Sequence, residues 1–499
     1  MKKLSTLILI MLGTGVLSCS QLAREQVQRV DMTEQMKQSL VYLKISVCGY
    51  DDFQPWKQGD ISEETGYGCA VSEYEVITPA WNIRNARFVE ARVHGKNEYI
   101  PAKIKVLDYE SNLCLIELDR TAMPRPLKPI TFTKDYREGA EVDFYWLSYD
   151  GQLYNGRGYL DKAEVRESTA SFTYSLNYIL ANTSKNAGRG QVNFISSEAI
   201  GVGCWRSSQS KEAGLIPAMI INRFLADAKD GNYKGPGVAG FKTTYLLDPT
   251  KRAYLKMPQG LKDGVCVTDV YNLGTGSDVL KKEDVILAID GKTIDPRGRF
   301  EDPQYGQLSF EHLITGKAAG ESVVFELWRD GQRMEVEGEV KNFDAAQMLV
   351  PYYEYDRQPE YVITGGFVLQ KLTRPYLAQW GDDWQGKAPS YLYNYYSNTA
   401  FKPTDERQDI VILSYVLSAK INLGYAGLGR IVVSKFNGMP IRSIEDILTA
   451  QKLYPDSKYD VIEFELDNPK VVIPREQLPA ADALIGRNYG IRKLVNVNQ

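Results

Sequence analysis

Residues 183–202 read TSKNAGRGQVNFISSEAIGV. A polar loop with two glycines leads here into two short apolar runs, VNFI and AIGV, which is typical of a loop followed by β-strands. Lys185 and Ala187 stand in the middle of the loop. Because an alanine side chain has no hydroxyl group, it cannot act as a nucleophile toward a carbonyl carbon. Acyl-transfer chemistry in this segment would therefore need a different residue.

The region upstream of this loop consists of short β-rich runs separated by turn residues. Between residues 41 and 119 these runs read VYLKISVCGY, GYGCAVSEYEVITPA and RFVEARVHGKNEYIPAKIKVLDYESNLCLIELD. Runs of this length with regular turns are typical of a β-barrel or a β-sandwich. We expect a second set of strands between about residues 127 and 205.

The region downstream of the loop follows a different pattern. Residues 284–294, DVILAIDGKTI, indicate a strand, a tight Asp-Gly turn and a second strand. A weak internal repeat of this pattern occurs at residues 431–441, IVVSKFNGMPI, with Asn437-Gly438 at the turn. Between the two copies lies an aromatic connector, LVPYYEYDRQPE at residues 349–360. Aromatic side chains at this density are expected to pack on another part of the chain.

These motifs together resemble the HtrA/Deg proteases, a family with a trypsin-like protease domain and PDZ domains. Residues 183–202 resemble the family's nucleophile loop, residues 76–82 (VITPAWN) its general-base motif, and residues 108–115 (DYESNLCL) the motif of its orienting aspartate. DVILAIDGKTI is similar to the PDZ domains of this family. The C-terminal part resembles the divergent second PDZ domain of the plant-type Deg branch, and in it residues 365–368 (GGFV) resemble a second carboxylate-binding loop.

The resemblance implies a mainly β fold with domains in a set order. A trypsin-like double β-barrel is expected at residues 39–230. Two PDZ-like α+β domains are expected to follow it, at residues 231–345 and 346–499.

The same resemblance implies that the catalytic residues are missing. The general-base position is Trp81, the orienting position is Asn112, the nucleophile position is Ala187, and an oxyanion-hole glycine is replaced by Lys185. We therefore expect a pseudoprotease that does not cleave peptides.

Two alternatives to this expectation stay open. One is a serine-type endopeptidase or other hydrolase with a non-standard catalytic set, in which Ser184, Cys204 or a nearby lysine takes part. The whole chain contains only two histidines, His94 and His312, as further candidates for a base. The other alternative is a structural partner of an active homologue.

Peptide binding is the function that the resemblance leaves intact. In the first PDZ-like domain the carboxylate-binding loop falls on Val238, Ala239, Gly240 and Phe241, and a helix near Phe310 closes the groove. The expected partners are peptide C-termini or unfolded proteins, which suits a chaperone, an adaptor or a scaffold. A homo-oligomer, or an assembly with a homologue, is also expected. The alternative to peptide binding is a groove that the chain's own second PDZ-like domain fills.

The N-terminus carries a predicted targeting signal. Two lysines precede an apolar run, and residues 1–18 are too short to be a good membrane-spanning helix, so they indicate a signal peptide. The end of this run resembles a bacterial lipobox, which implies lipidation of Cys19 and attachment to a membrane of the bacterial cell envelope, on a periplasmic or outer-membrane face. Residues 19–38 are expected to form a polar tether with a turn or two of helix. The alternative is an ordinary signal peptide with an unrelated cysteine.

Composition argues against several other functions. Lys and Arg number 59 against 63 Asp and Glu, a net charge of -4, and no basic stripe indicates nucleic acid as a partner. Five cysteines remain after Cys19, without a CxxC pair, so neither a disulfide framework nor a zinc site is indicated. No metal or other cofactor is expected.

Overall fold

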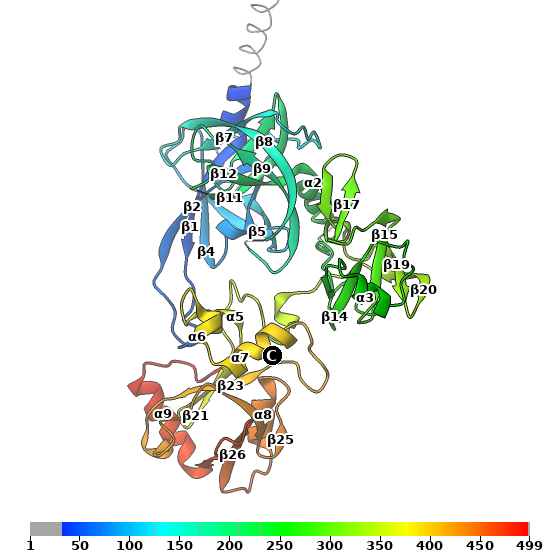
Figure 1. Ribbon diagram of the computed structural model, residues 1–499. Coiled ribbons are helices and arrows are strands. Elements are labelled where there is room, and N and C mark those ends of the chain that lie inside the picture. The colour runs from blue at the N-terminus through cyan, green and yellow to red at the C-terminus, as the bar shows by residue number, and fades with distance from the viewer. Residues whose placement is uncertain (1–31, 124, 169, 208, 230, 498–499) are drawn as a thin grey trace, which may run out of the picture.

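The computed structural model describes residues 32–123, 125–168, 170–207, 209–229 and 231–497. Two β-barrels lie at one end, a green α+β module lies to their side, and a second module, yellow to red, lies below them (Figure 1). A mainly β chain with a trypsin-like double barrel and two PDZ-like modules is therefore confirmed. Among the described residues, none of the helices has the length and apolar character needed to cross a bilayer.

Only part of the predicted N-terminal region is described. Cys19 and the predicted signal peptide lie outside the described residues. Residues 32–39 are helical, and the side chains of Met32 and Met36 are buried in the barrel core. The predicted tether allowed a turn or two of helix, and its described part, residues 32–38, is helical and packs on the barrel core. Methionines four positions apart lie on one face of a helix and can be buried together.

The first barrel closes in the order β1-β2-β3-β6-β5-β4. Its core is made by alternating apolar side chains such as Val41, Leu43 and Ile45. The strands are β1 (Leu40–Val47), β2 (Ser62–Ala70), β3 (Glu75–Thr78), β4 (Ala86–Val93), β5 (Ile100–Asp108) and β6 (Leu113–Leu118).

The second barrel closes in the order β10-β11-β12-β9-β8-β7 and is followed by one helix. The predicted nucleophile loop connects β9 to β10. The elements are β7 (Glu141–Leu147), β8 (Leu153–Glu167), β9 (Tyr174–Ala181), β10 (Val192–Ile195), β11 (Glu198–Ser207), β12 (Glu212–Pro217) and α2 (Ala218–Asp227).

The first PDZ-like module, called PDZ1 below, has a sheet in the order β13-β14-β15-β19-β20, so that β13 is an edge strand. Its elements are β13 (Phe241–Thr244), α3 (Pro249–Tyr254), β14 (Val265–Val270), β15 (Val285–Ile289), β16 (Lys292–Thr293), β17 (Arg299–Asp302), β18 (Gly306–Ser309), α4 (His312–Thr315), β19 (Ser322–Arg329) and β20 (Gln332–Glu339). The hydroxyl groups of Tyr305 in PDZ1 and Tyr178 in β9 are 3.1 Å apart, which links PDZ1 to the second barrel.

The second module, PDZ2, has the sheet order β27-β26-β24-β23-β22-β21-β28. Its elements are β21 (Tyr361–Thr364), β22 (Phe367–Lys371), α5 (Arg374–Ala378), α6 (Trp384–Lys387), α7 (Ser390–Thr399), β23 (Val411–Val416), β24 (Ile431–Phe436), β25 (Met439–Pro440), α8 (Glu445–Lys452), β26 (Tyr459–Phe464), β27 (Val471–Pro474), α9 (Leu478–Asn488) and β28 (Val495–Asn496). Helices α5, α6 and α7 lie between this sheet and the barrels (Figure 1).

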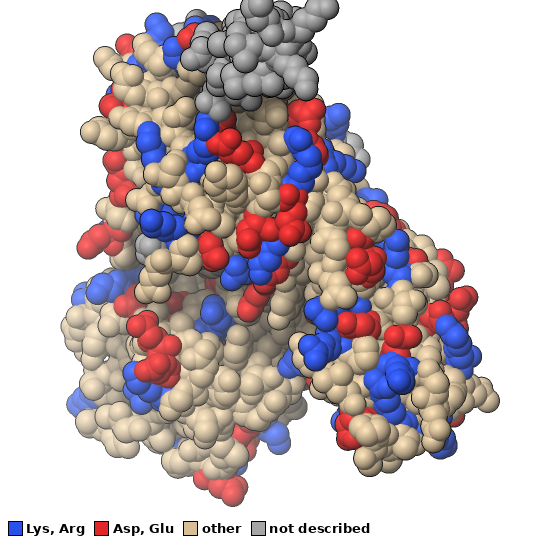
Figure 2. All heavy atoms as spheres, turned by 45° about the horizontal axis from the view of Figure 1, so that its top comes forward, with Lys and Arg blue, Asp and Glu red and all other residues tan. Residues whose placement is uncertain are grey.

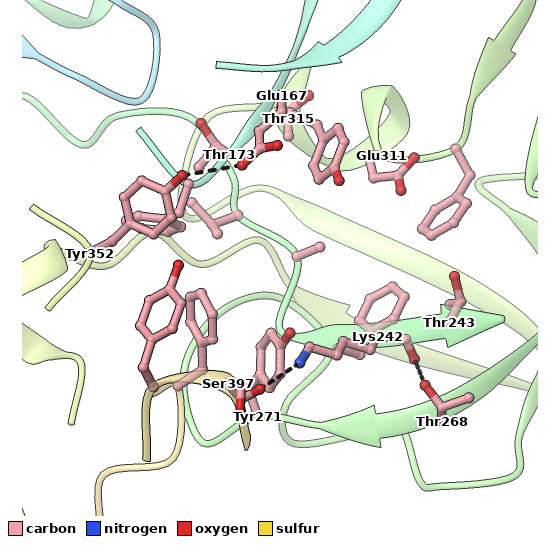
Figure 3. A pocket seen from close by; sticks show the side chains of 18 of the residues that line it. Glu167, Thr173, Lys242, Thr243, Thr268, Tyr271, Glu311, Thr315, Tyr352 and Ser397 are labelled. Carbon is pink, nitrogen blue, oxygen red and sulfur yellow. Dashed lines mark hydrogen bonds between the residues drawn. The ribbon is translucent and has the colours of Figure 1, made fainter. Parts of the chain in front are cut away.

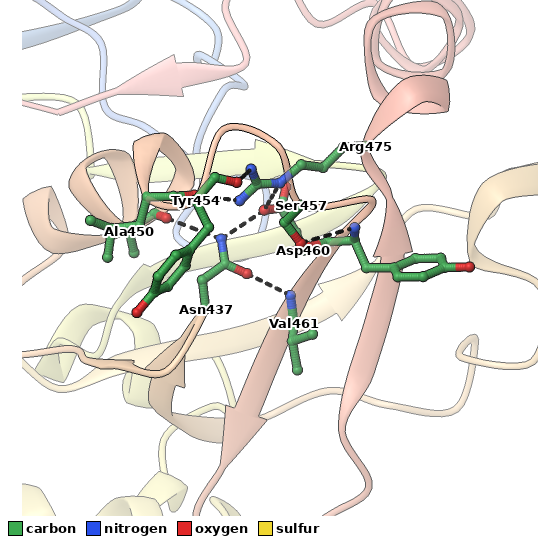
Figure 4. A network of polar contacts seen from close by, with 9 residues as sticks. Asn437, Ala450, Tyr454, Ser457, Asp460, Val461 and Arg475 are labelled. Carbon is green, nitrogen blue, oxygen red and sulfur yellow. Dashed lines mark hydrogen bonds and ion pairs between the residues drawn. The ribbon is translucent and has the colours of Figure 1, made fainter.

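The internal repeat predicted from the two turns is visible in their hydrogen bonds. Asp290 has φ 49° and exchanges two bonds with Val324, through its backbone N–H and its side-chain Oδ1. Asn437 has φ 50° and makes the same two bonds with Val461. Asn437 also donates to the carbonyl oxygen of Ala450 and to a carboxylate oxygen of Asp460 (Figure 4). Both turns thus use a side chain that tolerates the left-handed region and fixes the next strand.

The aromatic connector packs against the first barrel, as predicted. Tyr353 and Tyr355 stack with ring centroids 4.8 Å apart, and both contact Tyr109. Asp356 and Asn85 exchange backbone-to-side-chain hydrogen bonds of 2.6 and 2.9 Å. The connector therefore holds PDZ2 against the barrels.

Candidate functional site

The predicted base and orienting positions lie in contact. Trp81 is in the short helix η1 (Ala80–Asn82), and its backbone N–H donates to the side-chain oxygen of Asn112 over 3.0 Å. Asn112 is buried and has φ 53°, a region that asparagine adopts more readily than most residues. Its carbonyl oxygen also accepts from the N–H of Ala80. Asn112 thus has a clear structural role, and its amide carries no charge that could orient a base.

The loop that contains Ala187 packs against the first barrel. Ala187 is buried, whereas Lys185 is exposed with its ammonium group 5.6 Å from the centre of the Tyr154 ring. The N–H of Gly188 donates to the side-chain oxygen of Gln191 over 2.7 Å. The hydrogen bond to Gln191 therefore holds the backbone of the loop in place with a side chain of the loop itself.

One glycine explains how the loop approaches the first barrel so closely. Gly190 has φ +88°, and a Cβ atom there would lie 1.9 Å from the carbonyl oxygen of Tyr67 in β2. Only glycine fits at this point.

Two guanidinium groups contact the indole ring of Trp81. The guanidinium carbons of Arg84 and Arg189 lie 4.1 and 5.3 Å from the ring centre, which is cation–π distance. The family that the chain resembles has an imidazole base at this position. In this chain the position holds a tryptophan that two arginines contact. Sequence reasoning missed both arginines. Arg189 lies more than a hundred positions from Trp81 in the chain, whereas Arg84 is only three positions away and could have been considered.

The residues named for a non-standard hydrolase make structural contacts. The hydroxyl oxygen of Ser184 accepts the backbone N–H of Arg157 over 2.8 Å. Cys204 is buried, its sulfur lies 3.2 Å from the side-chain oxygen of Asn177, and burial raises the pKa of this thiol to about 12. A thiol with such a pKa is almost entirely protonated at neutral pH and is a weak nucleophile.

Both histidines lie elsewhere. Nδ1 of His94 lies 2.9 Å from the carbonyl oxygen of Gly151 in a surface turn. His312 begins α4 in PDZ1, and its burial lowers its pKa to about 4. Neither histidine is among the described residues that line the cleft between the barrels.

A cavity of about 510 Å³ occupies this cleft. Tyr67 and Asn82 contribute from the first barrel, and Trp146, Arg189 and Arg206 contribute from the second. The cleft therefore persists next to the predicted triad positions, with a polar, aromatic and cationic lining.

The second cavity, about 590 Å³, is the groove of PDZ1 (Figure 3). Val238, Ala239, Phe241 and Phe310 all line it, as the sequence predicts for a peptide groove. The rings of Phe241 and Phe310 stack with their centroids 6.0 Å apart. Gly240 contributes backbone only, and a Cβ atom there would lie 2.6 Å from the carbonyl oxygen of Leu273.

Successive backbone N–H groups point to opposite sides along the predicted carboxylate-binding loop. The N–H of Gly240 donates to the carbonyl oxygen of Thr275 over 2.8 Å, and the N–H of Thr275 donates to the carbonyl oxygen of Val238. In such a bridge the amide of Ala239 points to the opposite side.

The next amide follows from the pairing of β13 with β14. The N–H of Tyr271 donates to the carbonyl oxygen of Gly240 over 2.8 Å, which makes Phe241 and Val270 a non-hydrogen-bonded pair. The N–H of Phe241 therefore points to the open edge of β13, on the same side as that of Ala239.

The far wall of the groove comes from other domains. It includes Glu167 and Phe172 of the second barrel, Tyr352 of the connector, and Tyr396 and Phe401 of PDZ2. The hydroxyl of Tyr352 donates to the Glu167 carboxylate over 3.2 Å (Figure 3). The aromatic density of the connector was the only sequence signal for this wall.

The corresponding edge in PDZ2 is closed. Strand β22 pairs with β23 on one side and with β21 on the other. Gly365 and Gly366, predicted as a second carboxylate loop, have φ 56° and 87° and form a two-residue hairpin turn. Through this turn β21 pairs with β22, along the edge of β22 that corresponds to the open edge of β13 in PDZ1.

The chain is similar to several known proteins. Residues 350–495 match the family model of the PDZ domain. The chain is 28% identical over 444 residues to protease Do-like 2, chloroplastic, of Arabidopsis thaliana, which covers 88% of this chain and 71% of the relative. It is 25% identical over 424 residues to protease Do-like 4, mitochondrial, of the same plant, with 84% and 77% covered. A solved structure, HtrA-type protease AlgW with decapeptide, aligns at a TM-score of 0.48 with 15% identity over 62% of this chain and 98% of that one.

Proposed function

Since the chain is a homologue of the HtrA/Deg-type proteases with a PDZ domain, we propose that it binds peptides or unfolded chains without cleaving them. Its role is that of a chaperone, an adaptor or a scaffold. The binding site is the PDZ1 groove, and the protease-like domain is a pseudoenzyme.

One observation carries this proposal: the two sites of the molecule differ in what they retain. At the predicted triad, Trp81 contacts Asn112 and is covered by two arginines, and Ala187 is buried. At PDZ1, an edge strand, alternating amides and an apolar pocket of Phe241 and Phe310 are available to a ligand. An enzyme of this kind that loses its whole triad keeps a rate only about 10³ to 10⁴ times that of the reaction in water, and this residual rate needs an intact oxyanion hole.

The peptide in this proposal adds to β13 as an antiparallel strand. Its terminal carboxylate accepts hydrogen bonds from the amides of Ala239 and Phe241, and its last side chain packs against the pocket wall that Phe241 and Phe310 form. Charge-assisted bonds to a carboxylate are about twice as strong as neutral ones, so a free C-terminus is preferred to an internal segment.

The location and partners of the protein belong to the same proposal. Cleavage before Cys19 and its lipidation would anchor the chain to a membrane of the bacterial cell envelope, on its periplasmic or outer-membrane face. Two or more acyl chains give stable anchoring. Further copies of this chain, or an active homologue, are the proposed assembly partners.

Two assays on the purified chain without its signal peptide test the proposal. Labelled casein and a fluorophosphonate probe should give neither turnover nor labelling, for the natural chain and for Ala187→Ser, because a serine without a base stays a weak nucleophile. Peptides with an apolar C-terminus should bind, and their amidated forms should bind at least about tenfold more weakly. Labelling of the Ala187→Ser variant, or equal binding of amidated peptides, would contradict the proposal.

A further inference from the structure

The cleft between the barrels holds more positive charge than nearby acids neutralise. Arg84 is engaged by Glu64, with a nitrogen-to-oxygen distance of 3.1 Å. Arg189 donates to a neutral partner, the carbonyl oxygen of Cys204, over 3.2 Å. Within the described ranges, Arg206 has neither a hydrogen bond nor an ion pair to any side chain. Two of the three guanidinium groups thus lack a counter-charge.

The lining of the cavity reinforces this imbalance. Arg189 and Arg206 both line it, and its described lining includes no aspartate or glutamate. Arg189 and Arg206 are both exposed residues, and partial burial of the Arg189 guanidinium, followed by repulsion from Arg84 and Arg206, lowers its pKa. A negatively charged ligand would relieve this repulsion and give both arginines a partner.

The size and walls of the cavity indicate what kind of anion fits. Its volume of about 510 Å³ greatly exceeds that of a small inorganic anion, since one water occupies about 30 Å³ of liquid. Tyr67 and Trp146 supply aromatic surface beside the arginines. Guanidinium groups bind carboxylates in a bidentate fork, and aromatic rings pack on the apolar part of a peptide.

We propose that the cleft between the barrels is a binding site for an acidic peptide segment, in which Arg189 and Arg206 bind side-chain carboxylates and Tyr67 and Trp146 contact the neighbouring peptide. This inference rests on the proposed function only in that the ligand is a polypeptide. The site is separate from the PDZ1 groove and needs no free C-terminus.

The experiment measures fluorescence polarisation of a labelled, C-terminally amidated peptide with two adjacent glutamates, against the full chain without its signal peptide. The expected result is saturable binding that weakens with added salt, because partly exposed charges are screened. The glutamine version of the peptide should bind at least about tenfold more weakly. Arg206→Gln should also weaken binding about tenfold, and since Arg206 has no described partner, its loss should leave the fold intact.

Arg120→Gln is the matched control, because Arg120 is an exposed arginine of the first barrel that pairs with Glu117. It should change the Kd less than twofold. Equal binding of the glutamine peptide, an unaffected Arg206→Gln variant, or full competition by equimolar inorganic phosphate would overturn the proposal. A free-carboxylate apolar peptide measured in parallel separates the outcomes, because its binding at PDZ1 should not change with Arg206→Gln.

Discussion

PDZ1 and PDZ2 share a strand order and a set of hydrogen bonds, and they differ at one edge of the sheet. In PDZ1 the N–H of Tyr271 donates to the carbonyl oxygen of Gly240, and in PDZ2 that of Leu417 donates to Gly366, over 2.8 and 2.7 Å. The edge beside this bond is open at β13 in PDZ1. In PDZ2 the chain's own strand β21 occupies it, and β28 pairs with β21 in turn.

The difference shows that a glycine-rich loop before a strand does not by itself indicate a ligand site. Consecutive positive φ values at Gly365 and Gly366 match the twist of a two-residue hairpin, so the chain reverses and pairs with itself. The segment before Gly240 instead bonds to Lys317 and Lys341 and leaves the sheet edge. The proposal that peptides bind at PDZ1 and not at PDZ2 rests on this difference.

The largest expected effect comes from breaking the closed edge of PDZ2. Gly366 has φ +87°, and a Cβ atom there would lie 2.4 Å from both the carbonyl oxygen of Leu417 and the side-chain nitrogen of Asn422. Gly366→Val should destabilise PDZ2 by about 4 kcal/mol or more. Thermal unfolding and hydrogen exchange of β21 measure this loss.

Gly427→Ala is the control for this variant, because a Cβ atom there meets no atom within 4 Å. It should leave the unfolding temperature nearly unchanged. Retained protection of β21 in Gly366→Val would show that the hairpin does not depend on this turn.

The two equivalent turns allow a smaller and more quantitative comparison. Asn437 is half-buried and bonds to Val461, Ala450 and Asp460, so Asn437→Ala should cost about 2–3 kcal/mol. Asp290 is exposed, and Asp290→Ala should cost about 1 kcal/mol. Chemical denaturation of both variants tests the order, and a larger loss for Asp290→Ala would contradict this account of the repeat.

The smallest expected effect is a pH dependence that is specific to the PDZ2 hairpin. The Asp482 carboxylate accepts the N–H of Gly365 over 2.7 Å, and burial raises the pKa of Asp482 to about 6. An unfolded aspartate has a pKa near 3.9, so stability falls as pH rises from about 4 to about 6. Because the group is partly exposed, the loss should stay below about 1 kcal/mol.

Asp482→Asn should remove this part of the pH dependence. Burial also raises the pKa values of Asp52, to about 6, and of Glu354, to about 7, so the natural chain keeps a trend in the same direction. The measured quantity is the difference between variant and natural chain in denaturation midpoints at pH 4.5 and 7. Identical pH profiles would rule out a titrating Asp482.

Much of the fold was predictable because its signals are local. Short β-rich runs, the Asp-Gly turn at residue 290 and the aromatic connector each follow from neighbouring residues. The packing of the helix at residues 32–39 was missed, because it depends on the barrel core. The closure of the PDZ2 edge was missed as well, because the same two glycines are compatible with a ligand loop and with a hairpin.

The candidate sites were predictable to the same extent. Phe241 and Phe310 were named from the motif and line one groove in the structure. The contact of Arg189 with Trp81 and the position of Tyr396 in the same groove as Phe241 were not predicted. Both join residues that are more than a hundred positions apart. No pattern within a short window of sequence carries such information.

The most direct test of the central claim is single-residue hydrogen exchange with and without an apolar peptide that has a free C-terminus. The account predicts added protection at the amides of Ala239 and Phe241, which face the groove. The amide of Gly240, already bonded to Thr275, and the amides of β22 should exchange as before. Protection in β22 without protection at Ala239 and Phe241 would place peptide binding in PDZ2 and contradict the account.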